Sequence, residues 1–317
     1  MIKQFHFDMM NKEGEIEPAV LYREALAIAE YVDQGTDLHA AVLSEHHMAP
    51  YMTDPIGFGF AMAARTKECR VRLQSVVAPN YDPVRLAEQT AQLDIVSNGR
   101  LDLTLAWGYD PAERAMYPRN LKAPEFMGKL IPMLRAAWAG EEFSWDGRAG
   151  VLEQLPVQDR IPIFIAGVSE AAIKRAAALG DGFMATMEAS VPQYLAECEA
   201  LGKEPGEIRF PTPYKNFFVS NDPEETWQRV RPFAQHDADV YWQWTAHFQV
   251  PKQTVPATLE ECRASGEFMI VTPDEAIDYL KQSDVLYCKP LMGGLDPDVA
   301  WESARLLVEQ VFPALDS

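Results

Sequence analysis

The chain alternates strand-like and helix-like segments along most of its 317 residues. The strand-like segments are short and apolar, and each is followed by a stretch with the helical period. Eight strands are expected, at Ile2 to Asp8, Ala40 to Leu43, Val71 to Ala78, Leu101 to Ala106, Ile161 to Ala166, Phe183 to Thr186, within Ile208 to Val219, and at Val285 to Lys289. This alternation predicts a parallel sheet covered by helices, and the number of strands favours a closed (β/α)8 TIM barrel.

Nine helices are expected, at Pro18 to Gln34, Asp54 to Thr66, Val84 to Ser97, Glu125 to Ala139, Ser169 to Leu179, Val191 to Leu201, Pro223 to Gln235, Thr272 to Gln282 and Asp298 to Val311. A doubly wound open sheet is the alternative fold. No Gly-x-Gly-x-x-Gly loop follows the first strand, where a dinucleotide-binding fold of that kind carries it. Because barrels commonly exceed the usual domain size, one domain over residues 1–317 is expected.

Two segments interrupt the alternation. Gly140 to Arg160 is polar and is interpreted as a surface insertion. Asp237 to Glu267 is a longer excursion that carries Tyr241, Trp242, Trp244, His247 and Phe248 close together. Long loops in compact domains are usually functional or disordered, and aromatic residues argue against disorder. This excursion is interpreted as a lid or pocket wall, with a satellite packing cluster as the alternative.

The charge balance limits the classes of partner. With 28 Lys and Arg against 47 Asp and Glu, the formal net charge is −19. This excess disfavours binding to nucleic acid or to anionic membranes. No stretch is long and apolar enough to span a bilayer, and no signal peptide is recognised after Met1. Four widely spaced cysteines are expected to be buried thiols, which suits a cytoplasmic protein.

Three segments carry candidate chemistry. The pair His46-His47 follows a buried strand, and alternation along a strand lets only one of the two rings face a cleft. The segment Ala166-Gly167-Val168-Ser169 leads from a strand into a helix, whose free N–H groups attract phosphate. Trp107-Gly108-Tyr109 ends another strand and suits a flat ring lying against the backbone. Each segment has an ordinary structural interpretation as well, as a satisfied histidine, a helix cap or core packing.

Taken together, these segments resemble the bacterial luciferase-like flavin monooxygenases. The resemblance rests on Glu45-His46-His47, Pro79 with Pro83-Val84-Arg85-Leu86-Ala87-Glu88, Asn98-Gly99-Arg100, Gly108-Tyr109, Ala166-Gly167-Val168-Ser169, Gly180-Asp181-Gly182 and Val311-Phe312-Pro313. It is dense from Ile2 to about Tyr117 and from Ile161 to Thr186, and it returns in the last 45 residues or so. It is thin across 140–160 and 187–270.

The resemblance implies a barrel that holds reduced FMN, or in some branches the deazaflavin F420, at its carboxyl-terminal mouth. His46 would lie beside the flavin and act on the peroxyflavin, and His47 is interpreted as structural. An imidazole with an ordinary pKa can exchange protons at neutral pH. A cis peptide is expected at Gln74-Ser75. The remaining cofactor contacts would come from Ala106, Trp107, Gly108, Tyr109 and Gly167, with the phosphate on Val168 and Ser169.

The chain also departs from the family pattern. Luciferases place a phosphate-binding arginine where this chain has Trp107, so Arg114, Arg119 or Lys122 would replace it, or flavin would bind weakly, or the flavin would differ. Met187 stands where luciferase has a pocket tryptophan. The substrate pocket is expected to include Met9, Met187, Trp242 and Trp244.

The resulting hypothesis is a two-component monooxygenase that receives reduced FMN from a separate NAD(P)H:flavin reductase and uses O2, through a C4a-peroxyflavin, to oxygenate a small organic substrate. The alternatives are an F420-dependent oxidoreductase and a non-catalytic flavin-binding protein. A homodimer through the second and third helices is a family expectation. A glycosidase-like hydrolase is disfavoured, because Glu24, Glu30 and Glu88 fall on helices and form no carboxylate pair at strand ends.

Overall fold

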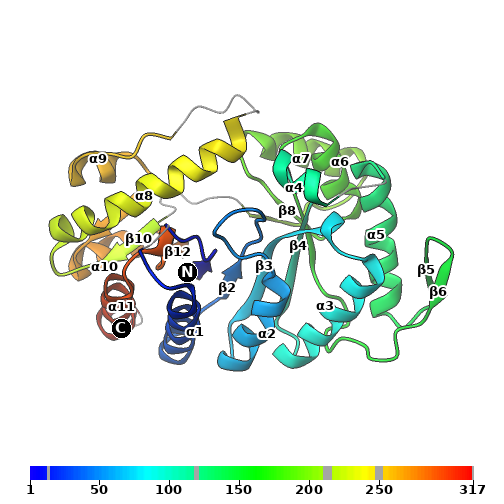
Figure 1. Cartoon of the computed structure of the whole chain (residues 1–317), viewed down its shortest axis with the longest axis horizontal. Helices are drawn as coiled ribbons and strands as arrows, with labels where there is room; N and C mark the ends of the chain where they lie inside the picture. Colours follow the sequence, from blue (N-terminus) through cyan, green and yellow to red (C-terminus); the bar gives the residue numbers. More distant parts are fainter. Residues whose placement is uncertain (13–14, 118–120, 210–215, 247–252, 316–317) are drawn as a thin grey trace. The chain divides into compact units, whose positions relative to one another are not determined.

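The computed structural model describes residues 1–12, 15–117, 121–209, 216–246 and 253–315. The chain divides into two compact units. Unit 1 comprises Met1–Thr53, Arg65–Arg70 and Thr212–Ser317, and unit 2 comprises Asp54–Ala64 and Val71–Pro211. Figure 1 colours the chain from its N-terminus in blue to its C-terminus in red.

Parallel strands form the centre of unit 1. β1 (Ile2–Phe7) pairs on one side with β12 (Val285–Cys288) and on the other with β2 (Ala40–Leu43). All four residues of β2 are buried, as expected for a parallel strand that is covered on both faces. A second parallel pair joins β10 (Asn216–Val219) to β11 (Phe268–Val271).

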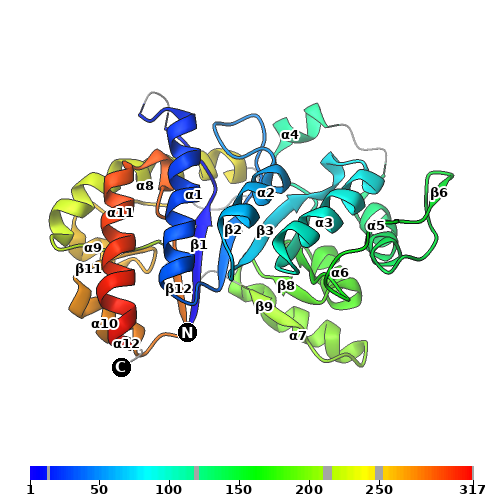
Figure 2. The same ribbon diagram turned by 90° about the horizontal axis from the view of Figure 1, so that it is seen from below.

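Helices cover these strands. α1 (Pro18–Gly35) and α11 (Pro297–Leu306) run side by side, as Figure 2 shows. The chain continues through a π-helical turn (Leu307–Val311) into α12 (Phe312–Leu315). The other helical segments of this unit are α8 (Pro223–Thr245), α9 (Leu259–Ala264), α10 (Pro273–Leu280) and the short turn η4 (Met292–Gly294).

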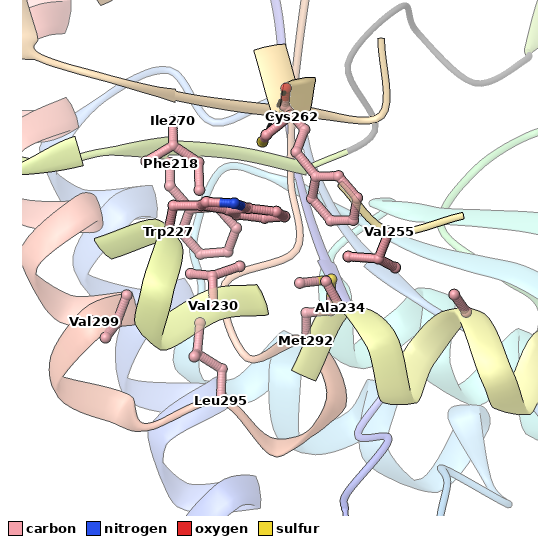
Figure 3. Packing of buried hydrophobic residues seen from close by; sticks show 12 residues of the cluster. Phe218, Trp227, Val230, Ala234, Val255, Cys262, Ile270, Met292, Leu295 and Val299 are labelled. Atoms are coloured by element: carbon pink, nitrogen blue, oxygen red, sulfur yellow. Dashed lines mark hydrogen bonds between the residues drawn. The ribbon is translucent and has the colours of Figure 1, made fainter. Parts of the chain in front are cut away.

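Trp227 anchors α8 to the rest of unit 1. Its indole is fully buried and packs against Phe268, with ring centroids 5.4 Å apart. Figure 3 shows it among apolar side chains from β10, β11 and α9, including Phe218, Ile270 and Cys262. Because a buried indole contributes a large apolar area, this cluster holds the first half of α8 firmly in place.

Unit 2 holds a row of five parallel strands. Their order is β3 (Arg70–Val77), β4 (Leu101–Ala106), β7 (Ile163–Ala166), β8 (Gly182–Met184) and β9 (Glu207–Arg209). The helical segments are α2 (Pro55–Arg65), η1 (Ala78–Asn80), α3 (Pro83–Ser97), α4 (Pro111–Met116), α5 (Ala123–Trp138), α6 (Glu170–Leu179), η2 (Glu188–Ser190) and α7 (Val191–Ala200). α3, α5, α6 and α7 pack in that sequence, each against the next.

Local capping explains where α3 begins and ends. Asp82 accepts hydrogen bonds from the backbone N–H groups of Val84 (3.0 Å) and Arg85 (3.1 Å), and Pro83 occupies the first helical position. Asn98 ends the helix in the left-handed conformation, with φ 56°, and Gly99 follows with φ 77°. The predicted start and turn are therefore confirmed.

The structure gives both interrupting segments regular elements and corrects one predicted helix end. Within 140–160, β5 (Phe143–Trp145) and β6 (Arg148–Gly150) form an antiparallel hairpin. α8 does not end at Gln235 but continues through Thr245, because the buried stripe of Trp227, Val230 and Ala234 continues to Ala238 and Trp244. Trp242 and Trp244 are thus helical residues, whereas His247 and Phe248 lie outside the described residues.

The strand and helix predictions missed further elements. The predicted strand within Ile208 to Val219 corresponds to the two strands β9 and β10, with residues 210–215 outside the described part. β11, α4 and α9 had no predicted counterpart. Among the residues that the structure describes, no helix is long and apolar enough to cross a membrane. All four cysteines are free and buried, as expected.

Candidate active site

The carboxyl end of β2 carries the two adjacent histidines. Glu45 and His47 are both buried, and the His47 Nε2 atom lies 2.6 Å from the Glu45 Oε1 atom. This pairing gives His47 the structural role that the sequence predicted. His46 is only half-buried, and its backbone N–H donates to the carbonyl oxygen of Met52 at 3.0 Å.

Aromatic rings surround the imidazole of His46. The indole of Trp244 stacks on it, with centroids 4.2 Å apart and planes 11° from parallel. Tyr51 and Tyr241 approach edge-on, at centroid distances of 4.6 and 5.8 Å. Loss of solvent around the ring lowers the pKa of His46 to about 3. The ring is therefore neutral at pH 7, which differs from the ordinary pKa assumed from the sequence.

A buried ionic cluster lies at the neighbouring strand ends of unit 1, and sequence reasoning missed it. Lys289, which follows β12, forms ion pairs with Asp8, which follows β1, and with Asp237 of α8. Burial alone would lower the pKa of Lys289, but the two carboxylates raise it. The signal was present in the sequence, because both Asp8 and Lys289 come at the carboxyl ends of apolar strands.

The predicted cofactor residues of unit 2 lie within β3, at the end of β4, and in the loops after β4 and β7. The peptide bond between Gln74 and Ser75 in β3 is cis, which confirms that prediction. β3 pairs with β4 through Val77 and Ala106, and β4 pairs with β7 through Leu105 and Ile165. Since parallel strands end at a common edge, the loops after β4 and β7 are neighbours there.

The loop after β4 holds the second predicted segment. Gly108 has φ 75°, a conformation that L side chains rarely adopt, which accounts for glycine at this position. The Trp107 ring packs edge-on against Phe126, with centroids 5.9 Å apart. Arg114, in α4, donates from Nη2 to the carbonyl oxygen of Tyr109 at 2.7 Å. Arg119 lies outside the described residues, and Lys122 precedes α5 as its N-cap.

The loop after β7 has the predicted cap. The Ser169 hydroxyl accepts a hydrogen bond from the Ala172 N–H at 3.3 Å and begins α6. Gly167 has φ 152°, and a Cβ there would lie 2.6 Å from the Cβ of Ala172. Packing against the helix therefore requires this glycine, whatever ligand approaches it. Val168 and Ser169 are both exposed at the helix start.

One buried oxygen atom of unit 2 lacks a hydrogen-bond donor among the described residues, which suggests a ligand as its partner. The Gln74 Oε1 atom is buried and accepts no hydrogen bond from the described residues. A buried acceptor without a donor costs about 1–3 kcal/mol, so such groups in native proteins usually have a partner. A bound molecule with an N–H or O–H group would supply it, and a flavin ring carries such groups.

The predicted substrate residues differ in exposure. Met9 is buried two residues after the end of β1, with φ 59°. Trp244 is 9% exposed and stacks on His46. Trp242 is 39% exposed on the same helix as Trp244. Met187, in unit 2, is 49% exposed before a short helical turn. Of these four, the structure brings Trp244 into contact with the predicted catalytic histidine.

Comparisons with curated proteins find relatives over part of the chain. The oxygenase component of a flavin-dependent trigonelline monooxygenase from Acinetobacter baylyi is 34% identical over 126 residues, which are 38% of this chain and 35% of that protein. An F420-dependent glucose-6-phosphate dehydrogenase from Amycolatopsis mediterranei is 28% identical over 159 residues, which are 46% of this chain and 47% of that protein. The chain thus matches less than half the length of either relative.

A solved structure shows the fold. The monooxygenase RslO1 from Streptomyces bottropensis superposes with a TM-score of 0.80 over 99% of both chains, at 22% sequence identity. This likeness confirms the predicted luciferase-like TIM-barrel fold class. The family model described as luciferase-like monooxygenase matches residues 2–264. The chain therefore belongs to the luciferase-like monooxygenase family.

Proposed function

We propose that this protein is a flavin-dependent monooxygenase of the two-component type. It would receive reduced FMN from a separate NAD(P)H:flavin reductase and use O2 to oxygenate a small organic substrate. The observation that carries the proposal is the buried Gln74 Oε1 atom, which accepts no hydrogen bond from the described residues. It belongs to β3, three residues before the edge at which the loops after β4 and β7 are neighbours. The flavin-dependent oxygenase component from Acinetobacter baylyi supports the same activity.

The residues of this edge have proposed roles toward the flavin. Val168 and Ser169 would hold its phosphate at the start of α6, where backbone N–H groups and the helix dipole favour an anion. Arg114 would supply the positive charge that Trp107 lacks, because a hydrogen bond to the Tyr109 carbonyl oxygen holds its guanidinium at the loop after β4. Gly108 would let the flat ring approach the backbone. When bound, the reduced flavin supplies the chemistry that activates O2.

His46 is the proposed catalytic residue. Because its imidazole is neutral at pH 7, it can donate or accept a hydrogen bond without bringing a charge. The aromatic rings around it keep water away from that side of the imidazole, which favours productive oxygenation over side reactions. Met9, Met187, Trp242 and Trp244 stay the predicted substrate contacts.

Two titrations test the proposal. The protein is titrated without oxygen with reduced FMN and, separately, with reduced F420, and binding is measured by isothermal titration calorimetry. Saturable binding of FMN with no binding of F420 is expected. Oxygen uptake with a flavin reductase, NADH and panels of aldehydes, sulfides and nitrogen heterocycles then identifies an oxygenated product. Tight binding of F420 and none of FMN would overturn the proposal.

Two alternatives are separated by the same experiments. The F420-dependent relative from Amycolatopsis mediterranei supports a hydride-transferring oxidoreductase, although a net charge of −19 disfavours the anionic tail of F420. A non-catalytic flavin-binding protein would bind FMN yet leave every substrate of the panel unoxidised. The predicted homodimer is checked independently by light scattering on the eluting protein.

A further inference from the structure

Five polar side chains of unit 1 form one hydrogen-bonded chain, here called the hydroxyl chain. It runs from Tyr287 of β12 through His6 of β1 and Ser44 after β2 to Tyr51 and then Tyr241 of α8. Tyr287 bonds to the His6 Nδ1 atom, and the His6 Nε2 atom bonds to the Ser44 hydroxyl. Ser44 bonds to Tyr51, whose hydroxyl lies 3.0 Å from that of Tyr241.

The hydrogen bonds of the hydroxyl chain must all point in the same direction, from donor to acceptor. Loss of solvent around His6 lowers its pKa to about 4, so the ring is neutral at pH 7. A neutral imidazole donates from one nitrogen and accepts at the other, and each hydroxyl has one proton to donate. The hydroxyl chain therefore has two possible arrangements of its hydrogen bonds. In one the O–H group of Tyr241 has no acceptor within the hydroxyl chain, and in the other this is true of Tyr287. Switching between them by proton transfer moves each proton by one place, and it leaves no charge in the chain only when one proton enters at one end and one leaves at the other.

The hydroxyl chain ends beside the predicted catalytic residue. Tyr51 and Tyr241 both present ring edges to His46. Burial and the Asp8 carboxylate keep the pKa of each phenol well above 10, so both stay protonated. Tyr287, His6 and Tyr241 are half-buried, whereas Ser44 and Tyr51 are buried. The hydroxyl chain is therefore closed to water at Ser44 and Tyr51 and reaches half-buried groups at both ends.

We propose that the hydroxyl chain delivers protons from water to the ligand bound beside His46. As a basic atom of the ligand takes the Tyr241 proton, Tyr51 reprotonates Tyr241, Ser44 reprotonates Tyr51 and His6 reprotonates Ser44. His6 regains a proton from Tyr287, which takes one from water. The net change is one proton moved from water to the ligand. Tyr51 and Tyr241 are relay residues in this proposal, which rests on the proposed function for the identity of the ligand.

The test uses Tyr51→Phe, which removes the middle hydroxyl and keeps the ring against His46. Tyr279→Phe is the matched control, because Tyr279 stacks on Phe217 in the same unit and is not a member of the hydroxyl chain. In the ligand-free protein, exchange of the His6 ring N–H with deuterated water is followed by 15N NMR. We expect exchange at least tenfold slower in Tyr287→Phe, which removes the hydroxyl on the water side of His6, and unchanged in Tyr279→Phe. Tyr51→Phe leaves this route to water intact, so its effect is measured in turnover. Equal exchange in the wild type, Tyr287→Phe and Tyr279→Phe would overturn the proposal.

Turnover provides the second measurement. If the wild-type protein oxygenates a substrate, Tyr51→Phe is expected to lower kcat at least tenfold and to change its solvent deuterium isotope effect, with flavin affinity within twofold. Unchanged kcat and isotope effect would refute the relay while leaving the proposed function standing. Absence of flavin binding by the wild-type protein would instead refute the proposed function. Tyr241→Phe repeats the test at the end of the hydroxyl chain should Tyr51→Phe fail to fold.

Discussion

At the scale of single residues, the surroundings of His46 decide what it can do. An exposed histidine changes charge close to neutral pH, but the rings of Trp244, Tyr51 and Tyr241 replace water around this one. The charged form is destabilised, and the pKa falls to about 3. His46 therefore acts as a neutral hydrogen-bonding group in the proposed reaction.

Replacing His46 tests that role. His46→Ala is expected to leave folding and reduced-FMN affinity almost unchanged and to lower the yield of oxygenated product at least about 100-fold, the usual scale for loss of one positioned hydrogen-bonding group. Product formed per O2 consumed is the measurement. His39→Ala, at an exposed position, is the control and should match the wild type. Unchanged coupling in His46→Ala would remove His46 from the catalytic role.

Ser169 combines a cap with a proposed phosphate contact. Ser169→Ala is expected to weaken reduced-FMN binding about fivefold, which corresponds to about 1 kcal/mol for one hydrogen bond. Loss of the cap also destabilises α6, so a second cap is the matched control. Thr272 caps α10 in unit 1, and Thr272→Ala should lower stability by a similar amount without changing the dissociation constant. If Ser169→Ala and Thr272→Ala bind reduced FMN with equal affinity, the Ser169 hydroxyl does not contact the phosphate.

At the scale of secondary structure elements, buried charges tie the strands of unit 2 together. The Asp102 carboxylate of β4 is 1% exposed. It accepts hydrogen bonds from Arg72 of β3 (3.1 Å) and from Arg209 of β9 (2.7 and 2.8 Å). The Arg209 guanidinium also lies over the Phe164 ring of β7, 3.3 Å from its centroid. One carboxylate thus connects side chains from separate strands.

Removing that carboxylate leaves two buried guanidinium groups with less compensation. Asp102→Asn is expected to lower the free energy of unfolding by about 3–5 kcal/mol. The exposed pair of Glu125 and Lys129 in α5 is the comparison, since Glu125→Gln should change stability by less than about 0.5 kcal/mol. Urea unfolding followed by circular dichroism measures both. A small effect in Asp102→Asn would mean that the arginines are satisfied by other groups.

Elements with strong local signals were predicted well. α3 has Asp82 and Pro83 at its start and Asn98-Gly99 at its end, and the structure places the helix between them. α8 was predicted too short, because Tyr241, Trp242 and Trp244 resemble a binding loop when only their composition is considered. Their helical conformation depends on the buried stripe that begins at Trp227, and burial of that stripe is a tertiary property.

At the scale of the whole molecule, pH should affect stability through histidines that lose contact with solvent on folding. His6 has an ordinary pKa near 6.5 when unfolded and about 4 when folded. Between these values the unfolded state binds more protons, so the free energy of unfolding falls as the pH drops from about 6.5 to 4. The loss from His6 is roughly 3.5 kcal/mol at most, from about 1.4 kcal/mol for each pKa unit.

Urea unfolding at pH 7, 6, 5 and 4 checks this dependence. His6→Gln should be less stable than the wild type at pH 7, because it disrupts two hydrogen bonds, and should lose less stability on acidification. His39→Gln should follow the wild-type profile, since His39 is exposed. A variant His6→Gln with the same slope as the wild type would show that other groups cause the acid dependence.

The amino-acid sequence by itself determined the alternation of strands and helices, the caps of α3 and α6, the cis Gln74-Ser75 bond through resemblance, and the family. These features depend on local patterns, which neighbouring residues contain. Only the tertiary structure joined Asp8, Asp237 and Lys289, or stacked Trp244 on His46. The residues that pair in these contacts are separated by about 50 to 280 positions in the sequence. Tertiary packing decides which side chains distant in sequence are buried next to one another. A charged group buried in this way is costly unless an opposite charge pairs with it.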